Sequence, residues 1–312
     1  MNPKATIIIL IIVCLLGASI FWLWQRQPKV KSAQTSAQTT TQQSTDTTAQ
    51  NDSLQITAPK NESIVTTSKT SINGKTQTAS YVVIYSNSIN TVVKSDKDGN
   101  FQTDINLTDG LNLISIQTIT GDPQKRITKS LTIWSAKKDP GASAVYAGSV
   151  KNIFDTVLTI TTQNGDKTVN TSKSTQVNLP NGEEEQAIKQ ATASANQKIR
   201  IGDFAIALGD PAQSGNKDTI TGRSIQIIRD NKPQNNEDFV AGTTLTGVKL
   251  NLFSAKSVVD SKIWEFTLNK NTSIQLNGQD AKQDAVVKDK NAIIIFHKED
   301  DKKVADLVYL TN

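Results

Sequence analysis

The hydrophobic pattern begins with an unbroken apolar run near the start of the chain. No charged residue occurs from Ala5 to Trp24, and nearly every position in that run is apolar. About 20 apolar residues, rising ~1.5 Å each, cover the ~30 Å core of a bilayer as a helix. The run exceeds the apolar region of a cleaved signal peptide and ends in aromatic rather than small residues. The pattern therefore predicts an uncleaved single-pass membrane anchor.

Residues 32–53 form a Ser-, Thr- and Gln-rich segment with no large apolar side chain. Such a segment cannot bury enough apolar surface to offset the entropy that the chain loses on folding. We therefore expect a disordered linker between the anchor with its basic flank, residues 1–31, and the folded part of the chain.

From residue 54 to residue 134 the apolar positions alternate with period two. In Asn112–Ile119 the residues Leu113, Ser115, Gln117 and Ile119 share one face, opposite Ile114, Ile116 and Thr118. Tyr81–Tyr85 is a nearly continuous apolar run, which is typical of an interior strand. Turn signals separate these runs at Asn73-Gly74, Asp98-Gly99-Asn100, Asp109-Gly110 and Gly121-Asp122-Pro123. About seven short strands with regular turns predict a β-sandwich.

Two further β-rich segments follow a linker at residues 135–144. The first, residues 145–232, contains a Gly202-Asp203 turn before a buried strand, and one helix candidate at Glu183–Ala195. The second, residues 239–312, repeats this plan weakly: Phe266–Leu276 matches Val169–Val177, and Asn291–His297 matches Phe204–Gly209. The sequence thus predicts an all-β fold with two tandem small barrels of the OB-like type after the sandwich.

Several short stretches carry a resemblance to known families. The segments Leu54–Lys60, Ser71–Lys75, Asp96–Phe101, Leu107–Ile114 and Leu131–Ile133 resemble the bacterial immunoglobulin-like family related to domain B of glucodextranase. The resemblance implies an Ig-like sandwich that serves as a spacer, an adhesin or a sugar-binding accessory, and it brings no catalytic residues. The barrels look like secreted bacterial domains of undefined function: Gly148-Ser149-Val150 and Gly202-Asp203 fit in the first copy, whereas the second keeps only Gly247-Val248.

The charge distribution limits the partners. The formal net charge is +5, and four of these charges are Lys4, Arg26, Lys29 and Lys31, which leaves +1 for the rest of the chain. The basic residues therefore suit anionic lipid headgroups, and no basic stripe predicts a nucleic-acid partner. The flanking charges alone favour a C-terminal side inside the cell. The linker and the β-modules favour the opposite orientation, which we expect.

Few residues are available for catalysis or metal binding. The single cysteine, Cys14, lies in the apolar run, and the single histidine, His297, is expected as an exposed strand-end residue. A serine or cysteine triad would have only this histidine, and a zinc site would depend on carboxylates. Asp96–Asn100 resembles a fragment of a calcium loop, but Leu107 stands where the loop needs its glutamate. A hairpin with Gly99 at positive φ explains it better, and we predict no metal and no cofactor.

These observations predict a membrane-anchored, extracytoplasmic bacterial protein without enzymatic activity. Its modules would make structural or adhesive contacts at the cell envelope, with a wall glycan or an envelope protein as partner. A carbohydrate-binding accessory is the alternative. Trp264 is the candidate ligand contact for that alternative, although its position beside Phe266 also suits a core. A glycosidase using two carboxylates is the third hypothesis, disfavoured because the acidic residues lie scattered in turns.

Overall fold

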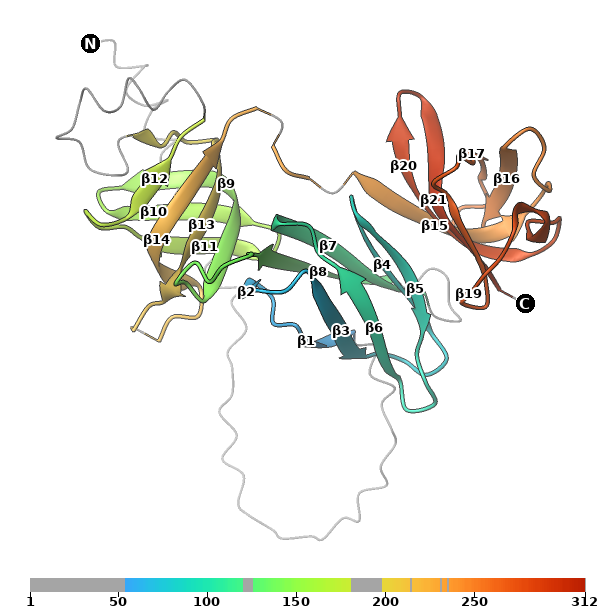
Figure 1. Cartoon of the computed structure of the whole chain (residues 1–312), viewed down its shortest axis with the longest axis horizontal. Coiled ribbons are helices and arrows are strands. Elements are labelled where there is room, and N and C mark those ends of the chain that lie inside the picture. The colour runs from blue at the N-terminus through green and yellow to red at the C-terminus, as the bar shows by residue number, and fades with distance from the viewer. Residues whose placement is uncertain are drawn as a thin grey trace, which may run out of the picture. The chain divides into compact units, whose positions relative to one another are not determined.

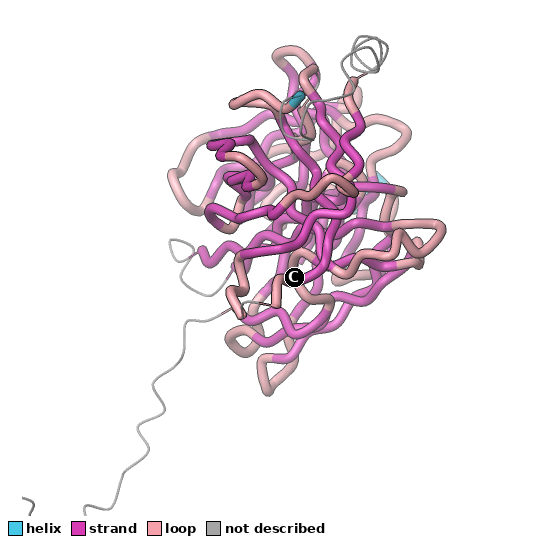
Figure 2. Tube along the Cα trace, turned by 90° about the vertical axis from the view of Figure 1, so that its left-hand side faces the viewer, coloured by secondary structure: helices cyan, strands magenta, loops and turns pink. Residues whose placement is uncertain are grey.

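The computed structural model describes residues 54–119, 126–180, 198–213, 215–230, 232–234 and 236–311 (Figure 1). The predicted anchor at Ala5–Trp24, the linker at residues 32–53, the turn at Gly121–Pro123 and the helix candidate at Glu183–Ala195 lie outside these residues. In the described part, strands joined by loops make up almost the whole trace, and the 3-10 helix η2 (Gln283–Ala285) is one turn long (Figure 2). The all-β prediction is confirmed. Within the described ranges, no helix has the length and apolar character needed to cross a membrane.

Strands β1 to β8 form a sandwich of two sheets. One sheet has the order β1-β3-β6, with β1 at Gln55–Ala58, β3 at Lys69–Lys75 and β6 at Asn100–Asn106. The facing strands have the order β2-β8-β7-β4-β5, with β2 at Ser63–Val65, β8 at Arg126–Ser135, β7 at Gly110–Ile119, β4 at Tyr81–Ser86 and β5 at Ile89–Lys94. Their inner faces bury one apolar cluster that includes Leu54, Ile72, Ile84, Ile114 and Ile133.

The predicted alternation along β7 is confirmed. Ile114, Ile116 and Thr118 are fully buried, whereas Leu113 and Ser115 lie half-buried on the opposite face. Strand β4 pairs with β5 and β7 and is buried on both faces, which is why its sequence is continuously apolar. Its inner residues belong to the sandwich core, and its outer residues pack against another part of the chain.

Strands β9 to β14 form the first barrel. A ring of five strands closes in the order β9-β10-β11-β14-β13-β9, and all neighbours are antiparallel except β11 and β14. The strands are β9 (Ala144–Phe154), β10 (Val157–Thr162), β11 (Gly165–Asn170), β13 (Phe204–Pro211) and β14 (Thr219–Ile228), and the short β12 (Gln176–Asn178) pairs in parallel with β14. The ring encloses a core that includes Leu158, Ile160, Val169, Ile220 and Ile225.

Strands β15 to β21 form the second barrel with the same plan. The order β15-β16-β17-β21-β20-β15 repeats that of the first barrel, and the parallel contact between β17 and β21 is a single pair, Thr267 with Val304. The strands are β15 (Glu237–Thr244), β16 (Leu252–Ser257), β17 (Ile263–Thr267), β18 (Ser273–Leu276), β19 (Gln279–Asp280), β20 (Asn291–Glu299) and β21 (Lys302–Thr311). The segments matched in the sequence thus occupy equivalent places: β11 with β17, and β13 with β20.

Glycines mark the close approach between the first two strands of each barrel. A Cβ atom on Gly148 would lie 2.1 Å from the carbonyl oxygen of Thr161, and one on Gly242 would lie 2.4 Å from that of Lys256. Both distances are far below a van der Waals contact, so only glycine fits without backbone movement. Gly242, rather than the Gly247 chosen from the sequence, is therefore the structural counterpart of Gly148.

Two predicted turns have different outcomes. Asn73-Gly74 is no turn, because both residues lie inside β3, where a Cβ on Gly74 would overlap the Phe101 ring. Before β6 the predicted turn is present: Gly99 has a φ of 81°, and Asp96 Oδ1 accepts the backbone N–H groups of Asp98 and Asn100 at 2.9 and 2.8 Å. The Asp96 carboxylate thus closes the turn. The predicted hairpin is wrong, because β5 pairs with β4 and β6 pairs with β3, so the turn connects the two sheets.

Candidate functional site

The sandwich is joined to the first barrel by a continuous sheet and by an ion cluster around the buried Lys167, in which the side chain of Glu62 is 12% exposed and that of Asp218 is 61% exposed. Strand β2 pairs in parallel with β8 and contacts β9 at Ser63 and Ala144, and Val145 N–H donates to the Glu62 carbonyl oxygen at 3.0 Å. An apolar cluster covers this joint from both sides, with Ile64, Leu111 and Trp134 of the sandwich packed against Val145, Ala147, Phe204, Ile206 and Leu208 of the barrel.

Lys167 on β11 is the centre of the ion cluster. Its side chain is 9% exposed, and its Nζ lies 3.0 Å from Glu62 Oε2 and 2.7 Å from Asp218 Oδ1, over the ring of Tyr146. Burial alone would lower the pKa of Lys167, but Asp218 and Glu62 outweigh it and raise the pKa. Burial raises the pKa of Glu62, against the opposing effect of Lys167. No local pattern in the sequence indicates this cluster, because its three members are far apart along the chain.

The sandwich is also joined to the second barrel, through an aromatic seam. We use "seam" for the apolar cluster in which the outer face of β4 meets the outer faces of β15, β20 and β21, with Val83, Tyr85, Phe239, Ile295, Leu307 and Tyr309 among its members. Tyr81 meets Tyr309 edge to face at 5.9 Å, and Tyr85 meets Phe239 at 5.8 Å. Such pairs add stability beyond their buried area.

Polar groups fix the rim of the seam. Asn87 Nδ2 donates to the Gln234 carbonyl oxygen at 2.8 Å, and Asn87 Oδ1 accepts the N–H of Asn236 at 2.9 Å. The Arg126 guanidinium stacks over the Phe239 ring at 4.9 Å. The chain between the barrels is thereby held on the sandwich.

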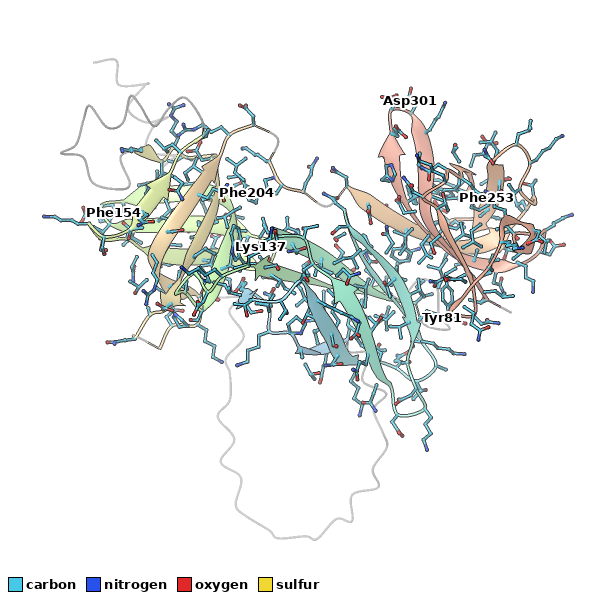
Figure 3. The ribbon with its side chains drawn as sticks, viewed as in Figure 1. Tyr81, Lys137, Phe154, Phe204, Phe253 and Asp301 are labelled. Atoms are coloured by element: carbon cyan, nitrogen blue, oxygen red, sulfur yellow. The ribbon has the colours of Figure 1, made fainter. Side chains whose placement is uncertain are left out.

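A cleft of about 590 Å³ opens beside the seam, where the sandwich, the first barrel and the connection between the barrels meet. Its volume lies in the range of small-molecule sites. Figure 3 labels Phe204, which contributes to the wall from the first barrel. The described lining has hydroxyl and amide groups, two carboxyl groups and no lysine, arginine or histidine: Tyr85, Leu113, Ser115, Ala147, Gly148, Ser149, Thr161, Thr162, Gln163, Phe204, Pro233, Gln234, Glu237 and Asp238.

Glu237 is a titratable group of the cleft lining, two residues before Phe239 of the seam on β15. Burial and, second, the negative charge of Asp306 raise the pKa of Glu237 to about 8, although a hydrogen bond from Asn90 acts in the opposite direction. With its amide oriented to satisfy both neighbours, Asn90 donates to Glu237 Oε2 at 2.5 Å and to the Ile89 carbonyl oxygen at 2.8 Å. The surroundings of Glu237 thus favour the neutral, protonated form of its carboxyl group.

His297 is not the exposed strand-end residue expected from the sequence. It lies half-buried on β20 directly opposite Glu237 of β15, and its Nδ1 is 2.8 Å from Asp306 Oδ2. A register shift between Ile295 and Phe296 places Asp306 at a bulge in β21, beside the histidine. Bulges leave no reliable signal in a single sequence, so this pair could not be anticipated.

The aromatic side chains of the two barrels have different environments. Trp264 is half-buried, with its ring 5.8 Å from that of Phe296 and Lys303 Nζ 5.1 Å above it, and it lines none of the cleft described above. Phe253 and Phe266 are in the core of the second barrel, whereas Phe154 is 75% exposed at a hairpin tip. The ligand contact assigned to Trp264 stays a prediction.

Comparison with known proteins adds no family to this picture. No protein-family model matches the chain, and no curated protein matches it.

Proposed function

We propose that the protein is a membrane-anchored, extracytoplasmic bacterial protein without enzymatic activity, which presents an Ig-like sandwich and two OB-like barrels for structural or adhesive contacts at the envelope. The observation that supports it best is the double attachment of the sandwich, through the Lys167 cluster and through the aromatic seam. Buried contacts of this kind hold modules in fixed orientations, whereas modules on bare linkers reorient freely. Fixed orientation is useful to a protein that displays surfaces to a partner.

The arrangement of carboxyl groups supports a role without catalysis. Glu237 and Asp238 both line the cleft, but they are consecutive residues of one strand and project to opposite faces of the sheet. A glycosidase needs two carboxyl groups that face each other across the scissile bond.

Protease treatment of intact cells tests the location. Digestion of residues 54–312 without lysis is the expected result. Protection of these residues until the cells are lysed would reverse the orientation and contradict the proposal.

A carbohydrate-binding accessory is the second candidate, and the cleft is the specific observation that favours it. Hydroxyl and amide groups beside apolar walls, without a cationic side chain in the described lining, suit a neutral polyhydroxylated ligand better than an anion. We expect full-length protein in detergent to be retained on insoluble cell-wall glycan and Ser149→Trp, which fills the cleft from an exposed position, to lose at least about tenfold in affinity.

The matched control is Ser174→Trp, at an exposed turn of the same barrel that does not line the cleft. Equal retention of both variants would rule the cleft out as the glycan site.

A further inference from the structure

We propose that the seam between the sandwich and the second barrel is a proton-operated latch, closed while Glu237 carries a proton and loosened when that proton leaves. The geometry brings one ionisable carboxyl group to the edge of an apolar, aromatic interface between two modules. Glu237 lies on the same face of β15 as Phe239, which packs against Tyr85 of the sandwich at 5.8 Å. Loss of the proton from Glu237 creates a negative charge at the edge of this interface. Either the charge stays in the interface, or strand β15 separates from the sandwich and carries the charge into water.

The groups around Glu237 come from several elements, including Tyr85 of β4, which lines the same cleft and pairs with Asn90. Asn90 of β5 donates to its carboxyl group, His297 of β20 lies directly opposite, and Asp306 of β21 holds the histidine. Asp238 follows on β15, and Arg126 of β8 lies over the neighbouring Phe239 ring. The hydrogen bond from Asn90 crosses the seam, so it anchors the carboxyl group of the second barrel directly on the sandwich.

The direction of the pH effect follows from linkage. The pKa of Glu237 is about 8 in the closed seam, against an ordinary value of 4.5 when the carboxyl group is exposed to water. The closed form therefore binds the proton more tightly, and closure is strongest below pH 4.5. As the pH rises from 4.5 to about 8, the ratio of open to closed molecules rises at most tenfold per pH unit, and above pH 8 it levels off. Acid closes the seam and alkali opens it.

The distance between the sandwich and the second barrel shows whether the latch is closed. In the full chain with Cys14→Ser, a spin label at Lys97→Cys marks the sandwich and one at Asp301→Cys marks the second barrel, since both positions are exposed. Figure 3 labels Asp301 at the hairpin between β20 and β21. Measured by pulsed electron paramagnetic resonance in detergent, one narrow distance is expected near pH 5 and a growing broad population is expected up to about pH 8.

Three substitutions make the test specific. Glu237→Gln keeps a neutral side chain and is expected to give the narrow distance at every pH. Asp306→Asn removes the charge that helps to raise the pKa of Glu237, so its broad population should level off at a lower pH. Glu265→Gln, which removes an exposed carboxyl group of the same barrel, should behave as the unsubstituted protein. A distribution that does not change with pH, or a pH response that survives Glu237→Gln, would overturn the proposal. Neither outcome depends on the cellular location proposed above.

Discussion

Lys167→Ala is expected to lower the free energy of unfolding by about 3–5 kcal/mol, the usual cost of removing one partner from a buried ion pair. The side chain of Glu62 is only 12% exposed, and without Lys167 its carboxylate has lost the ammonium group 3.0 Å away. The packing of the lysine stem on Tyr146 is lost as well. Urea unfolding of the full chain in detergent, followed by circular dichroism, measures the effect.

The loss should also depend on pH. Burial already raises the pKa of Glu62, and removal of Lys167 takes away an influence that lowers it. A carboxyl group with a raised pKa contributes full stability below its unfolded-state pKa and loses that contribution as the pH rises through the folded-state pKa. The Lys167→Ala protein should therefore be least impaired in mild acid, where Glu62 is protonated, and most impaired at neutral and alkaline pH.

Two comparisons make this result interpretable. Lys151→Ala removes an ion pair with Asp166 in the same barrel whose lysine side chain is 60% exposed, and it should leave the free energy of unfolding nearly unchanged. The double variant Lys167→Met with Glu62→Gln removes both charges and should recover most of the loss. If Lys167→Ala lowers the free energy of unfolding no more than Lys151→Ala does, the Lys167 cluster does not hold the sandwich and the first barrel together.

Asp203→Ala is the second substitution with a large expected effect, about 3–5 kcal/mol of unfolding free energy. Asp203 is 6% exposed, and its two oxygens accept from Arg229 Nε at 3.0 Å and Nη2 at 3.1 Å. Its Oδ2 also accepts the N–H of Arg200 at 2.8 Å, which fixes the turn at Gly202 before β13. The variant loses a bidentate buried pair and a turn contact together.

The first barrel contains a second ion pair that serves as the control for this prediction. Asp210 and Arg223 form a second aspartate–arginine pair, but the arginine side chain is 59% exposed. Asp210→Ala should cost little in the same urea experiment. Asp203→Asn, which keeps the shape and the oxygen that accepts from the turn, should fall between the two. Equal stability of Asp203→Ala and Asp210→Ala would contradict the assignment of the Gly202-Asp203 motif to a structural role.

The parts of the fold that sequence reasoning found are those with a local pattern. The alternation of β7, the doubly buried β4 at Tyr81–Tyr85, and the Gly202-Asp203 turn were all predicted from adjacent residues. The equivalence of the two barrels was also visible, because Val169 and Phe266 begin similar segments. The positive φ of Gly99 followed from its place in an Asp-Gly turn.

What was missed depends on contacts between distant residues. Gly74 has the composition of a turn residue, yet it is required inside a strand by the ring of Phe101, which comes 27 residues later in the chain. Glu62 likewise reaches Lys167 only through the joint between the sandwich and the first barrel. Asp306 lies beside His297 because of the bulge in the β20–β21 hairpin, which has no signal in the sequence. The cleft has no sequence signature at all, because its walls belong to separate modules.

The parallel pairing of β2 with β8 has a mechanical consequence. The chain enters the sandwich ahead of β2 and leaves it at the end of β8, and the two strands pair over Ser63 with Ile133, Ile64 with Trp134 and Val65 with Ser135. The pairing of β1 with β3 lies between the N-terminal end and β2, so a pull slides β2 along β8 once the force reaches β2. The ladder bonds then bear the force together, whereas a hairpin opened at one end breaks its bonds one after another. The sandwich is thus oriented to resist tension between what precedes it and the barrels that follow.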